Sequence, residues 1–127
     1  MKKIFLDVAG KNKGHYAPGV ISGNNLYISG QLSIDLDTRK VPEGSIEEHM
    51  KLALHNIEKV LKAAGLERKD VVQCRIYVVD INFWDAINDV YRDFFGEHMP
   101  ARIVVPVPTL HFGCMVEIEA VAEVANK

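Results

Sequence analysis

A single arginine stands where the chain enters a short apolar run near its carboxyl end. Arg102 directly precedes Ile103, Val104 and Val105, and prolines lie on both sides of the run. Arginine is rarely buried without a partner, so this side chain either points into water or binds an anion. A guanidinium binds a carboxylate through two parallel hydrogen bonds, a geometry that lysine cannot copy. From the residues alone, Arg102 is either a solvated strand end or a carboxylate-binding group.

Glu117 is the second residue with a candidate role in catalysis. A carboxylate within hydrogen-bond reach of a water molecule can act as a general base, which contributes about 10²–10⁴-fold in rate. Glu117 belongs to the alternating segment 115–124, in which Glu119, Val121 and Glu123 share its face. The alternative is that it is simply one of three surface glutamates.

The remaining reactive side chains show no recognisable pattern. The histidines lack H-x-H and H-x-x-x-H spacing, so the sequence predicts no metal site. Cys74 and Cys114 are too few for a disulfide framework, and Cys114 lies among apolar residues as a buried thiol would. Neither a G-x-S-x-G elbow nor a glycine-rich phosphate loop is present, and we expect no cofactor. The histidines are His15, His49, His55, His98 and His111.

Glycines lie near two predicted strand ends, in Gly14-His15-Tyr16 and Ser29-Gly30-Gln31. A glycine at such a place lets a ligand or another backbone approach closely. An ordinary turn glycine is the alternative for both.

Two amphipathic helices must position these groups. Ser45 to Glu48 forms a capping-box pattern, apolar residues then recur at three- and four-residue spacing, and Gly65 is the expected stop. The second helix is predicted to start near Asn82 and to end at Gly96. Its predicted buried face consists of Trp84, Ile87, Tyr91 and Phe94.

Strand patterns flank these helices, with two or three strands before the first helix, one between the helices and two after the second. The fold class is therefore α+β, a mixed sheet with both helices packed on one face. Prolines after Val105 place that strand at an edge or end it. The second face of the sheet must meet water or another subunit. The candidate strands cover residues 3–7, 25–29, 70–79, 101–105 and 115–124.

Length and composition narrow the function class. The 127 residues suggest one domain, 1–127, and 48% hydrophobic with 25% charged residues is ordinary for a soluble protein. A net charge of −2 provides no attraction to nucleic acid or anionic membrane. The N-terminal apolar stretch breaks at Asp7, too early for a signal peptide, and no segment is long enough to span a membrane. We expect a cytoplasmic protein.

Three stretches carry a resemblance to a known family. These are YISGQLSID (27–35), AINDVYRDFF (86–95) and PARIVVPVPTLHFGCMVEIEAVA (100–122). Together they resemble the reactive intermediate deaminase family, the RidA/YjgF-like proteins, over nearly the whole chain. The resemblance combines Arg102, after a proline-small pair, with the Glu-apolar-acidic motif at Glu117.

This resemblance implies a chorismate-mutase-like sheet of about six strands, assembled as a homotrimer with three clefts between subunits. It implies cofactor-independent hydrolysis of enamines and imines, of the 2-aminoacrylate and 2-iminopropanoate type, to 2-oxo acids and ammonia. Arg102 would bind the substrate carboxylate and Glu117 would position the water. Tyr16, Gly30, Asn88 and Val104 would complete the substrate-binding pocket.

The chain departs from the common family pattern at His15, at Val104 and at His111-Phe112-Gly113. The last three residues form a candidate specificity loop. Two other functions stay open: a non-catalytic trimer that senses small 2-oxo acids through Arg102, and an endoribonuclease. The acidic charge balance disfavours the endoribonuclease, because phosphate contacts dominate RNA affinity.

Overall fold

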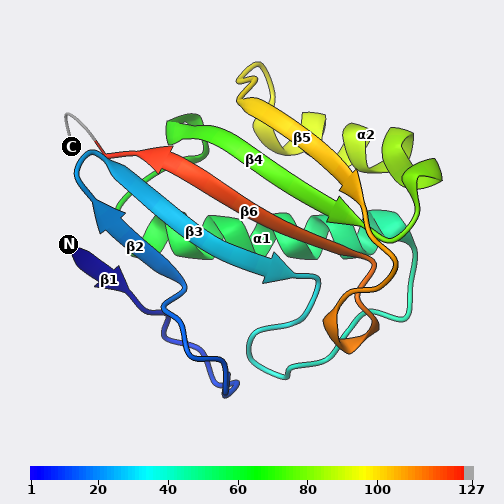
Figure 1. Cartoon of the computed structure of the whole chain (residues 1–127), viewed down its shortest axis with the longest axis horizontal. Coiled ribbons are helices and arrows are strands. Elements are labelled where there is room, and N and C mark those ends of the chain that lie inside the picture. The colour runs from blue at the N-terminus through cyan, green and yellow to red at the C-terminus, as the bar shows by residue number, and fades with distance from the viewer. Residues whose placement is uncertain (125–127) are drawn as a thin grey trace.

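The computed structural model describes residues 1–124 and shows one mixed sheet with two helices on the same side (Figure 1). The strand order within these residues is β1-β2-β3-β6-β4-β5. The expected α+β fold, a chorismate-mutase-like sheet with two helices on one face, is confirmed. The elements are β1 (Lys2–Ile4), β2 (Gly19–Ser22), β3 (Asn25–Leu32), α1 (Ile46–Ala63), β4 (Val71–Val78), α2 (Trp84–Phe95), β5 (Ala101–Pro106) and β6 (Val116–Glu123).

Strand pairing decides which side chains share a face. Every neighbouring pair is antiparallel except β4 and β5, which run parallel because α2 provides the crossover between them. β5 lies at the edge of the sheet and ends at Pro106, as the proline pattern predicts. β2 supplies the third strand before α1, between β1 and β3.

The first helix begins as its capping pattern predicts. The Ser45 hydroxyl accepts a hydrogen bond of 3.3 Å from the backbone N–H of Glu48. The helix ends at Ala63, and Gly65 follows with φ of 75°, a left-handed conformation that glycine adopts without a steric penalty. The apolar stripe of α1 packs on the sheet and forms the part of the core that faces β3 and β6.

The second helix starts two residues later than predicted and ends as predicted, with Gly96 following its last residue Phe95. Asn82 lies in a preceding turn of 3-10 helix, Ile81–Phe83, and the α-helix starts at Trp84. The prediction that Trp84 is buried is wrong, because it begins the helix beside the edge strand and remains 39% exposed. Phe94 is only partly buried, and Val90 and Phe95 take its place in the core.

His49 connects three segments beneath the sheet end that carries Glu117. Its Nε2–H donates to the Pro42 carbonyl (3.0 Å), so its Nδ1 accepts from the Ser33 hydroxyl (2.6 Å) and the Met115 N–H (3.3 Å). Burial lowers the pKa of His49, which keeps the ring neutral and the network intact. The residues that precede β6 are thereby fixed to α1.

The face of the sheet opposite the helices is open in the single chain. Tyr27, Val72 and Ile103 are exposed on it, and Arg75 pairs there with Glu119 at 2.8 Å. Along β6, Val116, Ile118, Ala120 and Ala122 face the helices, and the glutamates face outward as predicted. No helix within residues 1–124 is long and apolar enough to cross a membrane.

Candidate active site

Arg102 lies on the helix-covered side of the edge strand β5. In the parallel register it is the partner of Cys74 on β4, which is fully buried beneath the helices. Paired residues on neighbouring strands project to the same face, so the Arg102 side chain runs under α2. Val104, also half-buried, follows on the same face.

The guanidinium of Arg102 is surrounded by neutral groups. Its Nη1 donates to the Asn88 Oδ1 at 2.9 Å. Its central carbon lies 5.2 Å from the centre of the Trp84 ring and 4.8 Å from that of Tyr91. No carboxylate within residues 1–124 pairs with it. A fixed positive charge with free N–H donors and no anionic partner is what a carboxylate-binding site requires.

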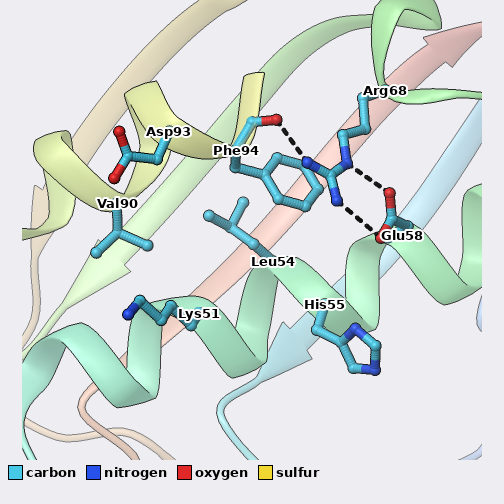
Figure 2. Close-up of a pocket in the computed structure, with 8 residues that line it drawn as sticks. All are labelled: Lys51, Leu54, His55, Glu58, Arg68, Val90, Asp93 and Phe94. Carbon is cyan, nitrogen blue, oxygen red and sulfur yellow. Dashed lines mark hydrogen bonds and ion pairs between the residues drawn. The ribbon is translucent and has the colours of Figure 1, made fainter. Parts of the chain in front are cut away.

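Arg68 shows the opposite arrangement, in a pocket of about 270 Å³ between α1 and α2 (Figure 2). Its Nε and Nη2 bind the two oxygens of Glu58, and its Nη1 donates to the Phe94 carbonyl at 2.8 Å. The guanidinium also stacks over the Phe94 ring at 3.9 Å. All three guanidinium nitrogens of Arg68 therefore have a hydrogen-bond partner. None of the predicted site residues lines this pocket. The arginine pocket in Figure 2 is structural, and Arg102 is the better candidate for a ligand.

Neither cysteine of the chain, nor the tyrosine beside Cys74, is ionised at neutral pH. Burial raises the pKa of the Cys74 thiol to about 11, so it stays protonated at neutral pH. The thiol lies beside the buried Tyr91 hydroxyl, whose pKa burial also raises. Cys114 is 1% exposed, which confirms the predicted buried thiol. Neither cysteine has the exposed, electropositive surroundings of a reactive nucleophile.

Glu117 lies against the backbone of Gly30. β3 carries a bulge between Ile28 and Gln31, so Gly30 lies within the strand and the turn alternative is wrong. A Cβ atom at Gly30 would lie 2.9 Å from the Glu117 Oε2, and only glycine leaves room for this approach. Burial raises the pKa of Glu117, the nearby Glu119 raises it further, and His111 opposes the shift.

Tyr16 reaches the same region through its neighbours in the chain. The Ser29 hydroxyl donates to the Ala17 carbonyl at 2.7 Å, and the Ser29 N–H donates to the Pro18 carbonyl at 2.9 Å. These bonds tie the segment after Tyr16 to the residue before Gly30. The Tyr16 ring is exposed, and its hydroxyl accepts from the Asn12 amide at 2.5 Å.

The segment His111–Gly113 forms a single turn of 3-10 helix just before β6. Phe112 has φ of 62°, a left-handed conformation that is unusual for a bulky residue. Its ring is 55% exposed, lies 3.7 Å from the His111 ring centre to centre, and is 5.8 Å from the Arg39 guanidinium. The turn therefore presents an aromatic surface on the side of the molecule that holds Glu117.

The structure separates the predicted residues into two groups. Arg102 is in register with Cys74 and Glu117 with Tyr77, three positions further along β4, so their side chains project from opposite faces of the sheet. One group, the Arg102 half-site, comprises Arg102, Asn88, Val104, Trp84 and Tyr91. The other, the Glu117 half-site, comprises Glu117, Gly30, His111, Phe112 and Gly113, and the hydrogen bonds of Ser29 hold the segment that follows Tyr16 beside it.

Trp84 and Tyr91 were predicted as core residues, and their contact with Arg102 was not foreseen. A signal was present, because Trp84, Asn88 and Tyr91 are spaced four and three residues apart on one helical face. Within the described part of the chain, no three His, Cys, Asp or Glu side chains lie close enough together to hold a metal ion.

Comparison with known proteins shows the family of this chain. Residues 8–124 match the family described as endoribonuclease L-PSP, which includes the RidA/YjgF proteins. The chain belongs to this family. A RutC family protein of Pyrococcus horikoshii is 39% identical over 119 residues, which cover 94% of each chain. The 2-iminobutanoate/2-iminopropanoate deaminase of Homo sapiens is 37% identical over 109 residues, 86% of this chain and 80% of the human protein.

Solved structures of the L-PSP family share the fold over nearly the full length. A putative endoribonuclease of Thermotoga maritima superimposes with a TM-score of 0.91 at 36% identity, covering 97% of both chains. E. coli TdcF, crystallised with bound serine, superimposes with a TM-score of 0.90 at 32% identity, covering 97% of this chain and 98% of TdcF.

Proposed function

We propose that this protein is a cofactor-independent deaminase that hydrolyses imines and enamines of the 2-iminobutanoate and 2-iminopropanoate type. The observation that carries the proposal is the Arg102 guanidinium, which is held by neutral groups with no carboxylate partner within residues 1–124. The named activity of mammalian family members at 37–41% identity supports the same reaction.

Arg102 binds the substrate carboxylate in this proposal. Asn88 occupies one guanidinium N–H, which leaves the others free for two parallel hydrogen bonds. Such charge-assisted bonds contribute about 1.5–3 kcal/mol, which is enough to orient a small substrate. Val104 supplies the apolar surface next to the carboxylate.

Glu117 positions and activates the attacking water. It takes a proton from the water as the oxygen bonds to the carbon of the protonated imine. The C=N electron pair moves to nitrogen, which gives a neutral carbinolamine. The carboxylic acid then returns this proton to nitrogen. The carboxylate takes the hydroxyl proton as the C–N bond breaks, and the 2-oxo acid and ammonia leave, with the ammonia carrying that last proton away as ammonium. The raised pKa of Glu117 makes it a stronger base than an exposed glutamate. Gly30 offers backbone beside this carboxylate, and the segment that follows Tyr16 lies beside the same half-site.

We further propose that the complete site forms between two copies of the chain, in a homotrimer. The two half-sites project from opposite faces of one sheet, so one chain cannot close both around a small substrate. The open sheet face, with exposed Tyr27, Val72 and Ile103, suits a subunit contact. In such an assembly the Arg102 half-site of one copy meets the Glu117 half-site of the next.

The turn His111–Gly113 selects the substrate side chain in this proposal. Phe112 presents an exposed ring in a strained backbone conformation, and strain of this kind accumulates at binding sites. An aromatic surface next to Glu117 favours imino acids with bulky apolar side chains over the smallest ones.

An imine-decay assay tests the reaction. An amino-acid oxidase generates imines in situ, and their loss to 2-oxo acid is followed with and without the protein. We expect acceleration by the wild-type protein and by Arg92→Ala, a control arginine on α2 whose one ion pair within residues 1–124 is with the exposed Asp89. Arg102→Ala should remain folded and lose the acceleration. No acceleration of any imine by the wild-type protein would refute the proposal, and binding of 2-oxobutyrate without turnover would instead favour a sensor.

A further inference from the structure

Two aromatic rings of α2 contact the guanidinium that we assign to substrate binding. Trp84 and Tyr91 lie seven residues apart, two helical turns, and Asn88 stands between them on the same face. The Arg102 guanidinium carbon is 5.2 Å from the Trp84 ring centre and 4.8 Å from the Tyr91 ring centre. Both distances are within the range of cation–π attraction.

The two rings have different surroundings. Tyr91 is 7% exposed and packs against Phe95 with ring centres 4.7 Å apart, and its buried hydroxyl lies beside the Cys74 thiol. The ring, and not the hydroxyl, is the part of Tyr91 that contacts Arg102. Trp84 is more than a third exposed, so it borders the space in front of the guanidinium. Tyr91 therefore contacts the guanidinium from the buried side, and Trp84 contacts it from the exposed side.

Aromatic rings hold a guanidinium in a way that a carboxylate does not. A carboxylate would occupy the N–H donors and cancel the charge, as Glu58 does for Arg68. A ring attracts the cation through its π-face and leaves the N–H groups free for a ligand. It also restricts the rotamers of a long side chain, so less conformational entropy is lost when a ligand binds.

We propose that Trp84 and Tyr91 form an aromatic clamp that fixes the Arg102 guanidinium in the orientation that receives a substrate carboxylate. Both are positioning residues. The inference rests on the proposed function only in taking a carboxylate as the ligand of Arg102, and it holds for a deaminase and for a 2-oxo acid sensor alike.

Direct binding of 2-oxobutyrate, measured by calorimetry on the assembled protein, tests the clamp without requiring turnover. Trp84→Leu should raise the Kd about three- to tenfold, the range expected when one cation–π contact is lost. Trp84→Phe should restore most of the affinity because it keeps a ring. Tyr91→Phe should bind like the wild type, because the clamp uses the ring and not the hydroxyl. Phe5→Leu, at an exposed phenylalanine just after β1, which is the edge strand opposite β5, is the matched control.

Kinetics distinguish positioning from a general loss of structure. A contact that serves the carboxylate in ground and transition states alike changes KM and leaves kcat nearly unchanged. Trp84→Leu should therefore raise KM for the imine three- to tenfold, with kcat within about twofold of wild type. If Trp84→Leu has the same Kd for 2-oxobutyrate and the same KM for the imine as the wild type, the clamp is wrong. Equally poor binding by Trp84→Phe and Trp84→Leu would overturn it too.

Trp84 is the only tryptophan in the chain, so its fluorescence reports directly on the site. Adding 2-oxobutyrate should shift or quench the emission with the same Kd as calorimetry, and Arg102→Ala should abolish the change. Binding that depends on Trp84 in a protein without imine turnover would refute the deaminase and keep the clamp. If the protein hydrolyses imines and the Trp84→Leu substitution changes neither Kd nor KM, the clamp is refuted and the deaminase proposal stands. Absence of any 2-oxobutyrate binding by the wild-type protein would refute the clamp.

Discussion

Replacing Gly30 with alanine displaces the Glu117 carboxylate by a distance that the structure fixes. The new Cβ would lie 2.9 Å from Oε2 and 3.1 Å from Cδ, whereas ordinary contact begins at 3.4 Å. The obstructing group is the end of a flexible side chain, so the carboxylate moves by about 0.5 Å and the strand stays in place. Gly30 has no positive φ, and alanine in a strand interior is favoured over glycine by about 0.5–1 kcal/mol.

The expected effect is on rate and not on stability. A misplacement of 1 Å can cost about 10²-fold in rate, so 0.5 Å should lower kcat for imine hydrolysis roughly tenfold. The imine-decay assay measures kcat, and thermal unfolding should show a melting temperature no lower than that of the wild type. KM should change little, because Arg102 is untouched.

Two controls make this prediction specific. Gly44→Ala also places a methyl group against a flexible glutamate, Glu48, outside both half-sites, and it should leave kcat unchanged. In a Glu117→Gln background, Gly30→Ala should cause no further loss, because both changes act through one carboxylate. An unchanged kcat in Gly30→Ala, or full additivity with Glu117→Gln, would refute the assignment of Glu117 to the water.

Three further outcomes follow from the same contacts. Because Glu117 must be deprotonated and its pKa is raised above the ordinary 4.5, kcat/KM should fall as the pH drops through that raised value, and His111→Asn should move this acid limb to higher pH. An acid limb of kcat/KM with its midpoint near pH 4.5 in both the wild type and His111→Asn would contradict this. Burial lowers the pKa of His49 in the folded state, so the unfolded state binds a proton more readily. As the pH drops from about 6.5, the free energy of unfolding should therefore decrease, and in His49→Gln it should depend less on pH. Phe112→Gly should raise the melting temperature by relieving the left-handed conformation, and should reduce kcat/KM for the phenylalanine-derived imine about tenfold relative to the alanine-derived imine. An unchanged preference would remove Phe112 from specificity.

The sequence predicts the elements whose signals are local. The Ser45 cap and the stripe of α1 depend on neighbours within a few residues, and the alternation along β6 shows directly which side chains face the helices. β2 is only four residues long, and its strand character depends on pairing with β1 and β3 on either side. Trp84 has the spacing of a core residue but lies over an edge strand, where no further strand covers it.

The arrangement of the site is less accessible to sequence reasoning. Arg102 and Glu117 can be named as candidates from the sequence, but the face on which each lies depends on register with β4. The bulge that brings Gly30 against Glu117 is also a tertiary feature, since one extra residue in β3 changes which side chains meet β6. Residue types therefore predict the chemistry, and strand pairing determines which groups can act together.

A mixing experiment tests most directly whether Arg102 and Glu117 act together from different copies of the chain. Arg102→Ala and Glu117→Gln are each expected to be inactive, and they are unfolded and refolded together in equal amounts. If each site takes its arginine from one copy and its glutamate from the next, about one quarter of the sites regain both groups, and about a quarter of wild-type imine hydrolysis should return. Activity that stays at the level of the separate variants, although the mixed assemblies form, would contradict the shared site.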